Sequence, residues 1–164
     1  MSAGAPVASA TRTNQLDLLA PRFRLAVENA LADFNALLES GDHAIVYETY
    51  RSPELQALYY ERGRSIIPPA GIVTNAQSNL YSWHGFGLAV DIIHKTKEWN
   101  AGDAWFRAVA DVLMAYGLRW GGEWKMKDLP HFQWGRCKPS PSDRAREILA
   151  QGGLPAVWRE VNAD

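Results

Sequence analysis

The stretch SWHGFGLAVDIIH, residues 82–94, constrains the fold of this chain more than any other. Gly85 and Gly87 disfavour a helix, and the apolar, β-branched run that follows is typical of a buried strand. Asp91 lies in the middle of this run, where an unpaired carboxylate is costly to bury. Such an aspartate requires a cation, a metal ion or several hydrogen-bond donors. We therefore predict a strand that carries part of a polar site, with His84 placed shortly before it.

Hydrophobic periodicity divides the remaining chain into helices and strands. The predicted helices span 21–40, 53–64, 103–116 and 142–151, and the predicted strands span 43–51, 87–94, 118–124 and 131–134. Residues 65–81 are rich in Pro, Gly, Asn and Ser, which indicates a long surface loop. Because the elements mostly do not alternate as strand, helix and strand, we expect an α+β fold with a small, mostly antiparallel sheet and helices packed against it.

The length of 164 residues is typical of one domain, which we place at 15–164 after a flexible N-terminal arm at 1–14. The net charge of −1 gives no bulk attraction to nucleic acid. No apolar run approaches the roughly 20 residues that span a bilayer, so we expect no membrane insertion. The one cysteine, Cys137, excludes a cysteine-rich zinc knuckle.

The four histidines differ in their surroundings. We expect His43, in a Gly-Asp-His turn, and His94, before a charged stretch, to be structural. His84 and His131 both lie beside apolar residues, and His84 precedes the strand that holds Asp91. Two imidazoles and one carboxylate match a catalytic zinc site, which uses three protein ligands and keeps a position for water. Residue types alone leave this interpretation open, because histidine and aspartate are common.

The spacing of these residues is similar to that of a known family. The pattern S-x-H-x-x-G-x-A-x-D is complete at 82–91, and D-x-x-H follows at 128–131. Together they resemble the M15, or VanY-like, zinc D,D-peptidases. Upstream, Tyr50-Arg51-Ser52 and Gln56 resemble the Y-R-S…Q segment of that family. Residues 117–134, GLRWGGEWKMKDLPHFQW, look most like the phage endolysin branch that cleaves the L-alanyl-D-glutamate bond, and the resemblance spans roughly Leu16 to Trp134.

The resemblance implies a role for each matching residue. Zn²⁺ would be held by His84, Asp91 and His131, and Asp128 would be the general base. Because three residues of straight strand would place Asp128 and His131 on opposite faces, the chain must turn between them. Glu123 is the alternative base.

The remaining matches concern the substrate. Arg51 would stabilise the oxyanion or grip a substrate carboxylate, or else form only a surface salt bridge. Ser82 would bind substrate or cap a turn, and Gln56 would contact substrate or lie on the helix surface. Apart from these matches, Trp83, Trp124 and Trp134 lie next to the proposed ligands in the sequence, and we expect them to line the walls of the cleft.

The implied function is hydrolysis of the peptidoglycan stem peptide by a monomeric endolysin of a phage or prophage. A D-alanyl-D-alanine carboxypeptidase or dipeptidase would keep the same ligands, and a non-catalytic zinc-containing binding module of the hedgehog type is the alternative from another class. The first residues lack the pattern of a secretory signal. We therefore expect synthesis in the bacterial cytoplasm and action on the wall after holin-type release or another form of delivery, such as that of a toxin-like effector. Lysostaphin-like and thermolysin-like peptidases are excluded, because their H-x-H and H-E-x-x-H motifs are absent.

Overall fold

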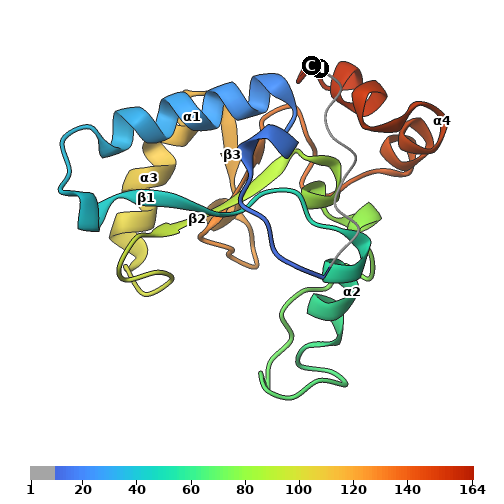
Figure 1. Ribbon diagram of the computed structural model, residues 1–164, viewed down its shortest axis with the longest axis horizontal. Helices are drawn as coiled ribbons and strands as arrows, with labels where there is room; N and C mark the ends of the chain where they lie inside the picture. Colours follow the sequence, from blue (N-terminus) through green and yellow to red (C-terminus); the bar gives the residue numbers. More distant parts are fainter. Residues whose placement is uncertain (1–9) are drawn as a thin grey trace.

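The computed structural model describes residues 10–164 (Figure 1). The four helices are α1 (Pro21–Asn35), α2 (Pro53–Glu61), α3 (Asp103–Ala115) and α4 (Asp143–Glu160). The four strands are β1 (Ala44–Glu48), β2 (Ala89–His94), β3 (Leu118–Trp120) and β4 (His131–Trp134). Short 3-10 helices lie between them as η1 (Leu16–Leu18), η2 (Ser40–Asp42), η3 (Asn79–Tyr81), η4 (Trp83–Phe86) and η5 (Gly121–Glu123).

The strands form one sheet in the order β1-β2-β4-β3, and every neighbouring pair is antiparallel. The predicted α+β fold is therefore confirmed. Side chains of β2 alternate between the two faces of this sheet. Val90 and Ile92 are fully buried in the hydrophobic core, which contains residues of α1 and α3 such as Phe23 and Phe106. Asp91 therefore projects from the opposite face, toward the cleft described below.

The hydrophobic core joins the sheet to the helices that flank it. Figure 1 shows α1 and α3 beside the sheet and α4 at the end of the molecule where the C-terminus lies. The indole of Trp158 in α4 is buried and donates to the carbonyl oxygen of Phe86 at 2.7 Å. Trp120 is also buried in the core. The Trp158–Phe86 hydrogen bond braces η4, the segment that carries His84.

Several predicted elements end elsewhere in the structure. The first helix ends at Asn35, not at residue 40, because the Asn35 amide pairs with both backbone groups of Ala44 at 2.8 and 3.0 Å. The first strand ends at Glu48, and β3 ends at Trp120 where η5 begins. The last helix is longer than predicted and continues past a kink at Gly153, whose φ is 73°.

Residues 1–9 of the predicted N-terminal arm lie outside the described residues. Within the described part of the arm, the carbonyl oxygen of Thr13 accepts from the backbone N–H of Thr49 at 2.9 Å. The Arg12 guanidinium lies 3.9 Å from the centre of the Tyr47 ring. Both contacts tie this segment to the end of β1.

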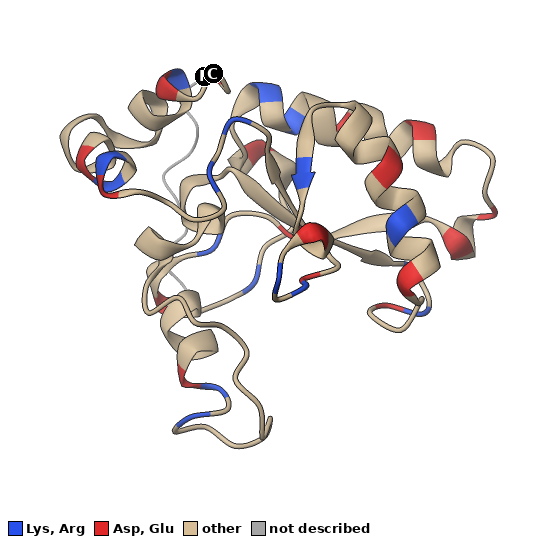
Figure 2. Cartoon of the chain, turned by 180° about the vertical axis from the view of Figure 1, so that it is seen from behind, with Lys and Arg blue, Asp and Glu red and all other residues tan. Residues whose placement is uncertain are grey.

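Charge is distributed over the whole fold. In Figure 2, basic and acidic residues are interspersed along the chain, in agreement with the net charge of −1. Between residues 10 and 164, no helix combines the length and the apolar character that crossing a membrane requires.

Candidate active site

The register of the sheet brings three ionisable side chains into one row. Asp91 on β2 lies opposite His131 on β4 and, on its other side, opposite Glu48 on β1. Between Val46 and Glu48 the pairing of β1 and β2 shifts by one residue, so Tyr47 has no partner of its own. Because directly opposite residues share a face, this bulge aligns Glu48 with Asp91.

His84 reaches the same row from the turn before β2. It lies in η4, and its own backbone N–H donates to the Ser82 hydroxyl oxygen at 3.3 Å. Gly87 ends η4 with a φ of 67°, and a Cβ there would lie 2.8 Å from the carbonyl oxygen of Leu18. Glycine is therefore required to turn the chain from His84 into β2.

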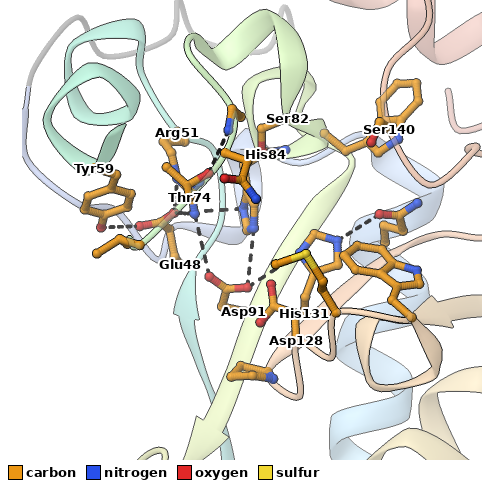
Figure 3. Close-up of a pocket in the computed structure, with 18 of the residues that line it drawn as sticks. Glu48, Arg51, Tyr59, Thr74, Ser82, His84, Asp91, Asp128, His131 and Ser140 are labelled. Carbon is orange, nitrogen blue, oxygen red and sulfur yellow. Dashed lines mark hydrogen bonds and ion pairs between the residues drawn. The ribbon is translucent and has the colours of Figure 1, made fainter. Parts of the chain in front are cut away.

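His84, Asp91 and His131 converge on one point (Figure 3). The Oδ1 atom of Asp91 is 3.4 Å from Nε2 of His84 and 3.8 Å from Nδ1 of His131. One possible ligand atom from each residue lies within 4.8 Å of the others. The three residues thus form a group that could hold a metal ion.

The outer nitrogen of each imidazole has its own acceptor. Nδ1 of His84 is 2.9 Å from the carbonyl oxygen of Thr49, and Nε2 of His131 is 2.8 Å from Oε1 of Gln133. The Gln133 amide donates in turn to the carbonyl oxygen of Lys138 at 2.8 Å. With the outer nitrogens protonated, both inner nitrogens present lone pairs toward Asp91, as metal ligands do.

The sequence analysis did not identify Gln133 or the Thr49 carbonyl oxygen as partners of the two imidazoles. The signal for Gln133 was available, since it lies two residues after His131 in HFQW and so shares its face of the strand. No sequence pattern points to Thr49, because its backbone carbonyl oxygen is the acceptor.

The ionisation states suit metal binding. Burial lowers the pKa of His131 to about 4, aided by the proximity of His84, so this imidazole is neutral at neutral pH. Burial would raise the pKa of Asp91, but the charges and hydrogen bonding of His84, together with His131 and Arg51, outweigh it and lower that pKa. Neutral imidazole and ionised carboxylate are the forms that bind metals.

Asp128 joins this group from the loop before β4. Its carbonyl oxygen accepts from the backbone N–H of His131 at 3.2 Å, which closes the turn predicted between these two residues. Its own N–H donates to the carbonyl oxygen of Gly121 at 3.0 Å, and a Cβ at Gly121 would lie 2.5 Å from the Asp128 carbonyl oxygen. Asp128 therefore stands beside Asp91 and His131 in the cleft (Figure 3).

The pKa of Asp128 is raised to about 6. Desolvation by the cleft walls is the larger cause and the nearby Asp91 carboxylate the second, while His84 and Arg51 oppose them. Asp128 is nevertheless exposed to solvent, and water screens these interactions. Glu123, the alternative base, is exposed on η5 and is not part of the cleft lining.

Arg51 is buried, so the surface salt bridge considered from the sequence is excluded: only 8% of the residue is exposed. Its Nη1 donates to Oε1 of Gln56 at 2.9 Å, and Nη2 is 3.7 Å from Oδ2 of Asp91. Gln56 is fully buried and does not lie on the helix surface. Its amide donates to the carbonyl oxygen of Ala76 at 2.8 Å. Gln56 therefore lies behind Arg51 and links it to the long loop.

The cleft has a volume of about 1020 Å³. Its walls include Ser82, Trp83 and Trp124, and the Trp124 ring centre lies 4.8 Å from that of His131. Residues 73–76 of the long loop, which projects away from the sheet in Figure 1, form another part of the lining. Trp134, expected in the wall, instead packs against Phe23 with ring centres 6.3 Å apart.

The other two histidines lie outside this group, as expected. His94 is buried at the end of β2, where its Nδ1 accepts from the backbone N–H groups of Thr96 and Lys97 at 3.1 and 3.0 Å. Nε2 of His43 is 3.0 Å from the carbonyl oxygen of Leu38.

Residues 75–134 match the M15 peptidase family model described as D-alanyl-D-alanine carboxypeptidase. The predicted M15 resemblance is confirmed. The matched M15 segment contains His84, Asp91, Asp128 and His131, whereas Arg51 and Gln56 precede it. Among solved structures, the chain is similar to the L-Ala D-Glu endopeptidase ChiX of Serratia marcescens. The identity is 22%, the match covers 71% of this chain and 88% of that chain, and the TM-score is 0.42.

Proposed function

We propose that this protein is a zinc-dependent peptidoglycan peptidase that hydrolyses the stem peptide at the L-alanyl-D-glutamate bond and acts as a phage or prophage endolysin. The observation that carries the proposal is the convergence of His84, Asp91 and His131 at a cleft, with Asp128 beside them. The match of residues 75–134 to an M15 peptidase model supports the reaction class.

The donor set fits zinc. Two nitrogen ligands and one carboxylate are the protein ligands that catalytic zinc sites use. His84, Asp91 and His131 would hold the ion, because the inner nitrogens of both imidazoles face the same carboxylate oxygen. When bound, zinc supplies Lewis acidity toward the scissile carbonyl and the attacking water.

Asp128 would act as the general base. It lines the cleft next to the three ligands, and its raised pKa makes it a better proton acceptor than an ordinary aspartate. In this proposal its carboxylate takes a proton from the attacking water and passes it to the departing amine. The non-catalytic zinc module is disfavoured, because such a module has no need of an acid in this position.

Two cationic side chains on the cleft walls could bind an acidic peptide. Arg62 and Lys127 line these walls together with Ser82 and Trp83. A D-glutamate in the stem peptide carries a free carboxylate, which either cation could pair with. Arg51, whose Nη2 lies 3.7 Å from Oδ2 of Asp91, would stabilise negative charge that develops on the scissile carbonyl.

Digestion of purified peptidoglycan tests the scissile bond. The proposal expects new N-terminal D-glutamate, identified by mass spectrometry of the soluble fragments. Release of D-alanine instead would indicate the D-alanyl-D-alanine carboxypeptidase, which the description of the matching family model favours. A zinc-loaded protein that releases neither product would be a binding module.

The acid side of the pH–rate profile should report the ionisation of Asp128. Its pKa of about 6 lies above that of an ordinary aspartate, and the base must be ionised to accept a proton. We therefore expect kcat/KM to fall as the pH drops through about 6, or somewhat lower because a bound cation favours the carboxylate. The measurement is kcat/KM on a soluble muropeptide between about pH 4 and 8. If the residual kcat/KM of Asp128→Asn fell with pH at the same midpoint, Asp128 could not be the group that titrates there.

A further inference from the structure

A second buried carboxylate lies beside the proposed metal site. Glu48 ends β1, is 1% exposed and stands opposite Asp91 because of the bulge at Tyr47. Like charges directly opposite each other on neighbouring strands repel. The two carboxylates therefore need a cation between them.

Arg51 is that cation (Figure 3). Its Nε and Nη2 atoms are each 2.5 Å from Oε1 of Glu48, whereas Nη2 is 3.7 Å from Oδ2 of Asp91. The Tyr59 hydroxyl donates to the other oxygen of Glu48 at 2.7 Å. Both oxygens of Glu48 are thus engaged, and Arg51 remains beyond hydrogen-bond distance of Asp91.

This arrangement affects what Asp91 can bind. A guanidinium pairs with a carboxylate through two parallel hydrogen bonds when nothing else holds it. If Arg51 paired with Asp91 in this way, it would compete with a metal ion for the same carboxylate. The hydrogen bonds to Glu48 and to Gln56 oppose that movement.

We propose that Glu48 is a positioning residue that holds Arg51 back from Asp91 and so keeps Asp91 available to the metal ion. The inference rests on the proposed metal site. It assigns a role to a residue outside the S-x-H-x-x-G-x-A-x-D and D-x-x-H motifs, and the role is exerted through Arg51.

Zinc affinity of the metal-stripped full chain tests the proposal, measured by competition with a chromophoric chelator. Glu48→Gln should weaken zinc binding about tenfold, as is usual for partners of metal ligands. In an Arg51→Gln background the same substitution should no longer weaken zinc binding, because the residue that Glu48 restrains is gone. Glu54→Gln, which removes an exposed carboxylate from the first turn of α2, should leave the affinity unchanged.

Each other outcome overturns the inference. Wild-type affinity in a folded Glu48→Gln variant would show that Glu48 does not position Arg51. Equal weakening in both backgrounds would show that Glu48 acts through its own charge. If Glu48→Gln does not fold, Tyr59→Phe, which releases one oxygen of Glu48, should weaken binding about two- to threefold, and an unchanged affinity would reject the role. Failure of the wild-type chain to bind zinc would instead reject the proposed metal site.

Discussion

Asp128→Asn is expected to lower kcat for stem-peptide hydrolysis by about 10³-fold, within the range of a lost general base. Asparagine keeps the shape of the side chain but cannot accept the proton of the attacking water. The variant should still bind zinc with the stoichiometry of the wild type, because Asp128 is not among the three converging ligands. The measurements are steady-state kinetics on a soluble muropeptide, metal content and thermal unfolding.

The stability of this variant should not fall at neutral pH. The folded-state pKa of Asp128 is raised to about 6, so its ionised form opposes folding above the ordinary aspartate pKa, and asparagine removes that charge. Glu123→Gln is the matched control, because Glu123 is an exposed carboxylate outside the cleft lining. Activity retained by Asp128→Asn and lost by Glu123→Gln would reverse the assignment of the base.

His84→Ala is expected to abolish both zinc retention and hydrolysis. It removes one of the three converging ligands and leaves Asp91 and His131, which is too few for a catalytic zinc site. Zinc at about a thousand times its Kd should stabilise the wild-type protein by about 4 kcal/mol, and this stabilisation should disappear in the variant. Metal analysis after dialysis, together with melting curves with and without zinc, measures both effects.

His43→Ala provides the control for this substitution. His43 contacts the Leu38 carbonyl oxygen, outside the converging group, so its replacement should leave zinc retention unchanged. Full zinc content in a folded His84→Ala protein would show that the ligand set is wrong. Loss of zinc from both variants would point to general destabilisation.

Most of the fold was predictable because its signals are local. The helical period of α3 matches its observed span to within one residue, and HFQW forms β4 as expected. The ends of α1 and β1 were not predictable. The first depends on Asn35 pairing with Ala44, and the second on where pairing with β2 stops, at Glu48 opposite Asp91. Neither contact leaves a periodic pattern in the sequence.

The sequence by itself determined which residues are available to the site: the spacing of His84, Asp91, Asp128 and His131 along two short motifs carries the family resemblance. Only the tertiary structure decided what surrounds them. Gln56, for which the sequence left open a substrate contact or a place on the helix surface, is buried and accepts a hydrogen bond from Arg51. The pairing of β1 with β2 brought Glu48 opposite Asp91. The physical reason is that motif spacing is a property of neighbouring residues, whereas cross-strand register and burial arise only when distant segments pack together.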